Sequence, residues 1–306
     1  MYLVTGGAGF IGSNIVDELV RRGQRVRVID NFITGRRENL RGVLHAIELV
    51  KGDIRDARVM AKVIRGVDYV LHQAAFRSVP KSVENPFLCT ETNVIGTLNV
   101  LMAASKAGVK RVVYASSSSV YGNVDTFPQK EAAVSSPLSP YGASKLAGEY
   151  YCKVYSYTLG LETVSLRYFN VFGPRQNPES KYSAVIPAFI SRMVTGKPPR
   201  VDGDGKQLRD FTYVANVVAA NLRAALARGI SGEVINVGCG DSYSVLDIVT
   251  CLNKLLGTNI RPVFGPPRQG DARKTQADIA QLKRYLGITP AVRFEEGLRK
   301  TLEWFR

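Results

Sequence analysis

A glycine-rich turn near the start of the chain restricts the possible fold more than any other feature. Gly6, Gly9 and Gly12 lie within Thr5–Gly12, which joins the apolar run Tyr2–Thr5 to a helical pattern. Glycines at this spacing let the backbone turn tightly, approach a pyrophosphate and pack the helix against the strand. The helix would offer its first N–H groups to the phosphates. The turn predicts a dinucleotide site, although a bare tight turn would also use glycines.

Short apolar runs alternate with helical patterns through the first half of the chain. The predicted strands are Tyr2–Thr5, Arg25–Ile29, Tyr69–His72, Val112–Ala115 and Thr163–Arg167, and the predicted helices are Gly12–Arg22, Ala57–Ile64, Val94–Ala107 and Tyr141–Leu159. This alternation predicts an α/β fold with a Rossmann-type, doubly wound parallel sheet. The pattern becomes irregular after residue 170. We expect a dinucleotide-binding domain over 1–170 and a smaller mixed α/β substrate-binding domain over 171–306, with some segments returning to the first.

An acidic residue, Asp30, follows the second predicted strand. An acid at this point of a dinucleotide-binding unit binds the adenosine ribose hydroxyls and repels a 2′-phosphate, so we favour NAD as the cofactor. Arg36 and Arg37 keep NADP open, and a strand-end cap is the plain alternative for Asp30. Asp53 and Ile54, after a third apolar run, are expected to frame the adenine.

Tyr141 and Lys145 stand four residues apart, a spacing that puts both side chains on one face of a helix. A phenol has a pKa of about 10 and is a poor base at neutral pH. A nearby ammonium and a bound nicotinamide cation would both lower that pKa. Lowering it by about three units takes about 4 kcal/mol. We expect a catalytic pair, whereas a solvated helix face is the ordinary source of such a spacing.

Composition argues against several other classes of protein. The 306 residues, 45% of them apolar, can bury a large core, and we see no membrane-spanning run and no signal peptide. Four cysteines without close pairs and two histidines argue against disulfides or a metal site, and favour the cytoplasm. The net charge of +15 is spread evenly over both halves, which argues against a nucleic-acid partner.

Further motifs follow in a fixed order along the chain. They are His72–Ala75, Asn93–Thr97, Ser116–Gly122, Tyr141–Lys145, Arg167–Asn170, Gly203–Gly205, Arg209–Phe211 and Arg268–Asp271. With the glycine turn they resemble the extended short-chain dehydrogenase/reductase family nearly end to end. Within it they resemble the NAD-dependent UDP-glucose and UDP-N-acetylglucosamine 4-epimerases.

The resemblance implies a catalytic set of Ser117, Tyr141 and Lys145. In such enzymes the tyrosine removes the proton from the sugar O4, while the lysine lowers the tyrosine pKa and binds the nicotinamide ribose. The serine orients O4. Hydride passes from C4 to NAD, the 4-keto sugar turns over, and hydride returns to its other face. For Ser117 the alternative is a strand end that caps its own backbone.

The resemblance also implies the residues that bind the cofactor and the UDP-sugar. Besides the glycines, Asp30, Asp53 and Ile54, the expected cofactor contacts are Phe10, Ile11, Asn31, Ala74, Asn93, Tyr141 and Lys145. Arg209 and Arg268 match diphosphate-binding positions, Asn170 another phosphate contact, Asp271 a ribose contact, and Val185 and Ile186 the border of the uracil. For Arg209 a surface ion pair with Asp210 is the alternative.

Differences within the family indicate the reaction. Sugar 4,6-dehydratases carry an Asp-Glu pair after the catalytic Thr, and UDP-glucuronate decarboxylases carry a Glu at the second of these positions. Here both positions are serines, Ser118 and Ser119, which would line the pocket. UDP-glucuronate 4-epimerases remain the alternative, with Arg77, Ser78 or Lys81 to hold a carboxylate. Residues 78–82 and 167–173 look more like enzymes of neutral or N-acetylated hexoses.

Thr275 bears on the choice of sugar. It follows Asp271 by four residues, where the family has either a bulky Tyr or a small side chain. A small residue leaves room for an N-acetyl group at C2, so we expect UDP-GlcNAc and UDP-GalNAc to be accepted beside UDP-Glc and UDP-Gal. The alternative is that Thr275 caps a helix ahead of Asp278.

The resemblance also implies a homodimer. The segments Asn93–Ala107 and Tyr141–Leu159 match the helices that form a four-helix bundle between family protomers, although their apolar faces could equally be core. Some proteins of this fold instead serve as NAD-binding, redox-responsive scaffolds or nucleic-acid binders. These usually lose the tyrosine or the lysine, and this chain keeps both.

Overall fold

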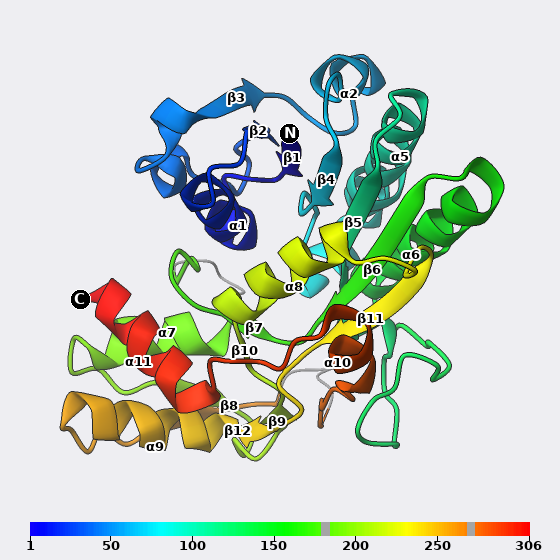
Figure 1. Cartoon of the computed structure of the whole chain (residues 1–306). Helices are drawn as coiled ribbons and strands as arrows, with labels where there is room; N and C mark the ends of the chain where they lie inside the picture. The colour runs from blue at the N-terminus through cyan, green and yellow to red at the C-terminus, as the bar shows by residue number, and fades with distance from the viewer. Residues whose placement is uncertain (179–183, 268–272) are drawn as a thin grey trace.

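A seven-stranded parallel sheet forms the centre of the computed structural model, which describes residues 1–178, 184–267 and 273–306 (Figure 1). The strand order is β11-β6-β5-β4-β1-β2-β3, with β1 (Tyr2–Thr5), β2 (Val26–Asp30), β3 (Ile47–Lys51), β4 (Tyr69–His72), β5 (Arg111–Ser117), β6 (Glu162–Tyr168) and β11 (Glu233–Val237). The order reverses between β1 and β4, which is where such folds bind dinucleotides. The predicted Rossmann-type fold is confirmed.

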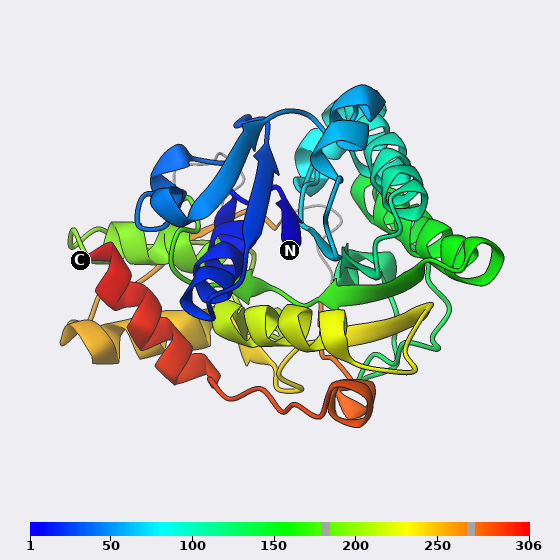
Figure 2. The same ribbon diagram turned by 45° about the horizontal axis from the view of Figure 1, so that its top comes forward.

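Helices cover both faces of this sheet (Figure 2). On one face lie α1 (Phe10–Arg21) and α8 (Val214–Leu226), and on the other lie α2 (Ala57–Val63), α5 (Gly96–Lys106) and α6 (Pro140–Leu159). The strands are apolar on both sides for this reason: Leu3 packs into one core and its neighbour Val4 into the other. The two cores fix the sheet between the helix layers.

The predicted strands and helices of the first half are confirmed, with ends that move by one or two residues. The helix predicted from Val94 is the exception, because it starts earlier. It runs from Pro86 to Lys106 and consists of α4 (Pro86–Thr90), a π-helical turn (Glu91–Ile95) and α5. By length and composition this helix could cross a membrane, but 44% of its most apolar window is buried within the fold. Such burial is typical of a core helix, and the absence of a membrane partner stays a prediction.

The second half of the chain contributes to two regions. Its β11 and α8 belong to the central sheet and its cover. Smaller pairs form beyond the sheet: β7 (Val171–Phe172) with β10 (Thr212–Tyr213), β9 (Leu208–Arg209) with β12 (Tyr243–Ser244), and β8 (Arg200–Asp202) with β13 (Val263–Gly265). In the described residues of the second half, the other α-helices are α7 (Val185–Met193), α9 (Val245–Leu256), α10 (Ala280–Leu286) and α11 (Phe294–Phe305). The first half also contains the short helix α3 (Val79–Glu84).

A long connection between β5 and α6 ties these regions together. Gln129 lies within it and pairs with the strand-like segment 274–277: its N–H donates to Gln276 O at 2.7 Å, and its carbonyl accepts from Asp278 N at 2.9 Å. Residues of the second half are thus held against the connection that follows β5 and Ser117.

Candidate active site

The glycine turn requires glycine for steric reasons. Gly6 has a φ of +66°, and a Cβ there would lie 2.7 Å from the backbone of Ala74. A Cβ on Gly12 would lie 2.2 Å from the carbonyl oxygen of Gly6. Within the described residues no side chain caps α1 at Gly9, so its first N–H groups stay available. Phe10 and Ile11 form the first turn of α1. The turn therefore fits the pyrophosphate of a dinucleotide.

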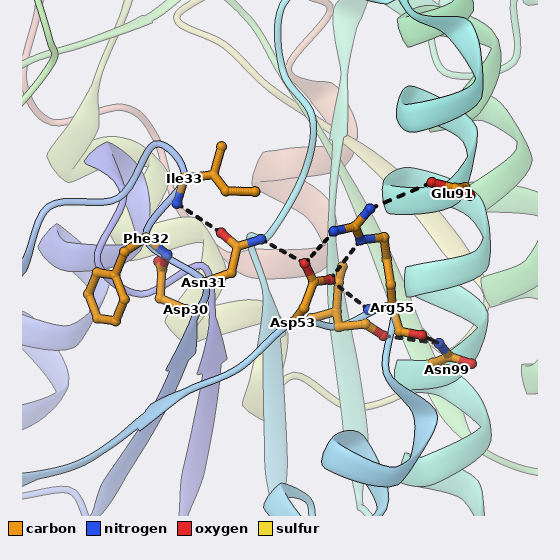
Figure 3. A network of polar contacts seen from close by, with 9 residues as sticks. Asp30, Asn31, Phe32, Ile33, Asp53, Arg55, Glu91 and Asn99 are labelled. Atoms are coloured by element: carbon orange, nitrogen blue, oxygen red, sulfur yellow. Dashed lines mark hydrogen bonds and ion pairs between the residues drawn. The ribbon is translucent and has the colours of Figure 1, made fainter.

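Asp30 lies beside this turn at the end of β2 (Figure 3). Its Oδ2 accepts from Ala8 N at 2.9 Å, and its Oδ1 accepts from Phe32 N at 2.8 Å. Burial raises the pKa of the carboxyl, and these two N–H donors oppose the rise. The carboxylate therefore does cap the strand end, as the plain alternative has it, and its contact with the ribose stays a prediction. Gly35 packs directly against it.

A polar network continues from Asn31 across the sheet edge (Figure 3). Asn31 Nδ2 donates to Asp53 Oδ2 at 2.9 Å, and Arg55 donates to both oxygens of Asp53 at 2.8 and 3.0 Å. Arg55 holds the pKa of Asp53 down at about 2 and also faces Glu91 at 3.6 Å. The side chain of Ile54, by contrast, is buried in the core. This network holds the loops after β2 and β3 together.

Asn93 is fully engaged with the protein itself. Its side-chain amide accepts from Phe76 N at 2.7 Å and donates to Phe76 O at 3.0 Å and Ser144 Oγ at 2.9 Å. It thereby ties the loop that follows β4, which includes Ala74 and Arg77, to α6. The structure gives Asn93 a positioning role, which the expectation of a cofactor contact did not include.

His72 forms a buried hydrogen-bond chain that the sequence did not reveal. Thr97 Oγ1 donates to Asn93 O at 2.6 Å, so it accepts from His72 Nε2 at 3.0 Å. His72 Nδ1 is then the acceptor of Thr5 Oγ1 at 2.7 Å. Burial, with Lys145 nearby, lowers the pKa of His72 to about 3, so the ring is neutral. Only the pairing of β1 with β4 makes this chain visible.

Tyr141 and Lys145 lie on α6 where it passes over β5. Ser139 caps the helix by accepting from Gly142 N at 3.1 Å, and Pro140 occupies the first turn. Lys145 is buried, and its Nζ donates to Ala115 O at 2.8 Å. Burial lowers the pKa of Lys145 to about 8.

Tyr141 meets Ser117 at the end of β5. Burial raises the pKa of the phenol, while a hydrogen bond with Ser117 and the charge of Arg77 lower it. A lowered pKa was expected from the sequence; in this structure burial outweighs the nearby charges. Tyr141 is thus brought to Ser117, and Lys145 lies on Ala115 O two residues before Ser117; their catalytic roles stay predictions.

Ser117 also caps its own chain, as the alternative for it proposed. Its Oγ accepts from Ser119 N at 3.1 Å and donates to Ser119 Oγ at 3.1 Å. Ser118 and Ser119 form the 3₁₀ turn Ser118–Val120 beyond β5 and are partly exposed. Capping and a place beside Tyr141 are therefore compatible.

Asn170, Asp210 and Thr275 contact one another where the segment after β6 meets the second half of the chain. Asn170 Nδ2 donates to Asp210 O at 3.2 Å and to Thr275 Oγ1 at 3.0 Å, which also accepts from Asp210 N at 3.3 Å. The capping alternative for Thr275 is wrong, because α10 begins after Ile279 without a side-chain cap.

Arg209 and Asp210 do not form a surface ion pair, so that alternative is also wrong. Both are buried, and Asp210 accepts N–H groups of Cys239, Gly240 and Ala277 at 2.8 to 3.1 Å. Burial raises the pKa of Asp210 to about 6. The buried carboxylate instead fixes the strand that carries Arg209.

Other expected substrate residues differ in their placement. Ile186 is buried in the core, while Val185, the first residue of α7, is partly exposed. Arg77 is exposed beside α3, whose Ser82 hydroxyl accepts from Tyr141 N at 3.2 Å. Arg268 and Asp271 lie outside the described residues.

Comparison with known proteins gives a consistent result over the whole chain. A model of the NAD-dependent epimerase/dehydratase family matches residues 2–238. A putative UDP-glucose 4-epimerase of Methanocaldococcus jannaschii is 39% identical over 100% of this chain and 98% of its own length.

Two solved structures extend the likeness. A UDP-N-acetylglucosamine 4-epimerase from Methanobrevibacter ruminantium, in complex with UDP-N-acetylmuramic acid, is 40% identical with a TM-score of 0.95, covering 99% of this chain and 97% of that one. A Thermus thermophilus UDP-glucose 4-epimerase in complex with NAD is 38% identical with a TM-score of 0.91, covering 99% and 98%.

Proposed function

The chain belongs to the NAD-dependent epimerase/dehydratase family, and from this premise we propose that it interconverts the C4 epimers of UDP-hexoses. Its substrates are UDP-glucose and UDP-galactose, together with UDP-GlcNAc and UDP-GalNAc. The observation that carries the proposal lies at the carboxyl end of β5, where Tyr141 hydrogen-bonds Ser117 and Lys145 donates to Ala115 O, two residues before Ser117.

The glycine turn at Gly6, Gly9 and Gly12 and the Asp30 carboxylate would hold NAD, which would supply a hydride acceptor and donor for C4 of the sugar. Tyr141 removes the proton of the O4 hydroxyl as C4 is oxidised, which yields a 4-keto sugar, and returns a proton when C4 is reduced. Ser117, which hydrogen-bonds the phenol, orients O4. Lys145 supplies the positive charge that favours the phenolate.

The neighbouring serines support epimerisation over the family's other reactions. Elimination of water or loss of carbon dioxide calls for additional acid–base groups beside the catalytic hydroxyl. Ser118 and Ser119 occupy those positions here, and a hydroxyl is too weak an acid for either task.

Thr275 supports the acceptance of N-acetylated sugars. Its side chain is small, and its hydroxyl accepts hydrogen bonds from Asn170 Nδ2 and Asp210 N. A Tyr here would lose both hydrogen bonds and fill the space next to C2. We expect Thr275→Tyr to lower the turnover of UDP-GlcNAc relative to UDP-Glc at least tenfold, whereas Thr275→Ser keeps the wild-type ratio. An unchanged ratio in Thr275→Tyr means that this residue does not select the sugar.

Proton NMR of the purified protein tests the function directly. UDP-Glc, UDP-GlcNAc and UDP-GlcA are supplied separately without added NAD, and the anomeric signal of the C4 epimer is followed. New signals from the first two support the proposal. Conversion of UDP-GlcA alone favours the glucuronate 4-epimerase, for which Arg77 is the candidate carboxylate partner. Silence in all three, also with NAD added, disproves the function. Salt-dependent RNA binding together with such silence would favour the non-enzyme alternative.

We also propose a cytoplasmic homodimer, formed through the outer layer of α4, α5 and α6. Large apolar side chains are exposed on these helices and on the π-helical turn between α4 and α5: Phe87, Ile95, Met102, Tyr150, Val154, Tyr157 and Leu159. α4 and α5 both pack against α6, so the three helices form one layer. Exposed apolar patches of this kind are typical of protein interfaces.

A further inference from the structure

A buried ion pair lies behind the catalytic residues, and neither partner takes part in the proposed chemistry. Arg167 on β6 donates to both oxygens of Glu149 on α6, from Nε at 2.9 Å and from Nη2 at 2.8 Å. The two side chains are only 5% and 4% exposed. Glu149 follows Tyr141 and Lys145 at intervals of four residues, so all three share one helix face.

The pair is connected to the strand that carries Ser117. Ser116, the preceding residue, donates its hydroxyl to Glu149 Oε1. Ser116 and Arg167 are direct partners in the pairing of β5 with β6. One carboxylate on α6 is therefore bound to both strands at the level of the candidate site.

The Arg167 guanidinium also reaches the connection between β5 and α6. It lies 4.6 Å from the ring centre of Tyr121 and donates to Glu131 O and Ser135 Oγ, both at 3.3 Å. The same ion pair thus anchors the segment that runs from Ser117 to the start of the catalytic helix.

The depth of α6 on the sheet is set by a separate contact. A Cβ on Gly148 would lie 2.2 Å from the Tyr114 hydroxyl, so the helix rests directly on β5. This contact limits how closely the helix approaches β5. By itself it does not fix the rotation of the helix about its own axis. The two-pronged bond between Glu149 and Arg167 restricts that rotation, because a planar fork holds a carboxylate in one orientation.

We propose that Glu149 and Arg167 are positioning residues that hold α6 at the rotation where Tyr141 meets Ser117 and Lys145 meets Ala115 O. The proposal rests on the proposed epimerase function. A buried ion pair loses much of its attraction to desolvation, so it is weak evidence for a stabilising role alone. Its links to Ser116 and to the following connection are what favour a geometric role.

Glu149→Gln tests the proposal, because it keeps the size of the side chain and removes its charge. We expect kcat to fall about 30-fold or more, with KM changed less than about threefold, since a small misplacement of a catalytic group costs rate rather than binding. Glu162→Gln is the matched control. Glu162 pairs with Arg111 at the other end of the same two strands and should keep wild-type kcat.

The pH profile separates positioning from a general loss of stability. Lys145 is faced by Cys89, Cys152 and Glu149, by His72, and by the ring of Tyr114. Removing the Glu149 charge makes the ammonium easier to deprotonate. The alkaline limb of kcat should therefore move to lower pH in Glu149→Gln and stay in place in Glu162→Gln.

A second variant guards against failure to fold. Ser116→Ala removes one hydrogen bond to Glu149 without changing a charged side chain, and we expect a fall in kcat of about three- to tenfold with unchanged circular dichroism. Wild-type kcat in Ser116→Ala and in folded Glu149→Gln overturns the positioning role. Silence of the wild-type protein on every UDP-sugar would instead refute the proposed function, so the two failures are distinguishable.

Discussion

At the scale of single residues, the site keeps a cation in the interior of the protein. Lys145 is only 3% exposed, and burial lowers its pKa from 10.5 to about 8. A shift of this size corresponds to about 3 kcal/mol of unfavourable burial at neutral pH. The ammonium keeps two favourable contacts in the interior, with Ala115 O and with the Tyr114 ring. Placing an ammonium beside Tyr141 thus lowers the stability of the protein.

Lys145→Met should separate stability from activity. We expect Lys145→Met, assayed with NAD, to lose about 10³-fold or more in kcat. Without NAD, the variant should match or exceed the wild-type free energy of unfolding at pH 7. The folded pKa lies below the unfolded one, so the wild type carries the full cost below about pH 8 and sheds it as the pH rises toward 10.5. The advantage of the variant should shrink over that interval.

Urea unfolding at pH 7, 9 and 10 measures this difference. Lys153→Met is the control, because Lys153 is exposed on the same helix. It should leave the difference from wild type independent of pH. A wild-type protein that is more stable than Lys145→Met at pH 7 by several kcal/mol would contradict the predicted burial cost.

At the scale of elements, α6 carries the site and its packing sets the geometry. The helix begins at a Ser139 cap followed by Pro140 and ends at Gly160, which has a φ of +66°. Between these ends it contacts β5 and β6 and also the helices α4 and α5. Helix propensity does not explain the glycine at position 148, because Gly destabilises a helix interior by about 1 kcal/mol relative to Ala. Close approach to Tyr114 is the reason that the structure supplies.

Gly148→Ala should therefore destabilise the protein although alanine is the better helix former. The added Cβ meets the buried Tyr114 ring, which is 1% exposed and has no space to withdraw. We expect a net loss of about 2 kcal/mol in urea unfolding and at least a tenfold lower kcat. Gly42→Ala is the control, since a Cβ there meets nothing within 4 Å and its φ is not positive. Equal stabilities of both variants would show that α6 can move off β5.

At the scale of the whole molecule, the two halves of the chain build one site. β11 and α8 from the second half complete the central sheet and its cover. Asp210, Thr275 and Asn170 join three further segments next to β6.

The proposed dimer gives a prediction at this scale. Light scattering after size-exclusion chromatography should give twice the mass of the chain. Met102→Asp combined with Val154→Asp, on α5 and α6, should give the monomer, because each charge would have to be buried without a partner in the interface. Val134→Asp, in an exposed position of the connection between β5 and α6, should leave the dimer intact. A monomeric wild type would contradict the proposal.

The sequence by itself determined the features that depend on local spacing. The glycine turn, the alternation of strands and helices and the four-residue interval from Tyr141 to Lys145 all follow from neighbours along the chain. These were enough to predict the sheet, the class of cofactor and the catalytic helix.

Only the tertiary structure decided which distant residues share a surface. The neutral tautomer of His72 depends on Thr5 and Thr97, and the pairing of Glu149 depends on Arg167 and Ser116. It also placed Asp210 in the interior and raised the pKa of Tyr141 through burial. These properties arise from desolvation and strand register, which act between residues far apart in sequence and leave no local pattern.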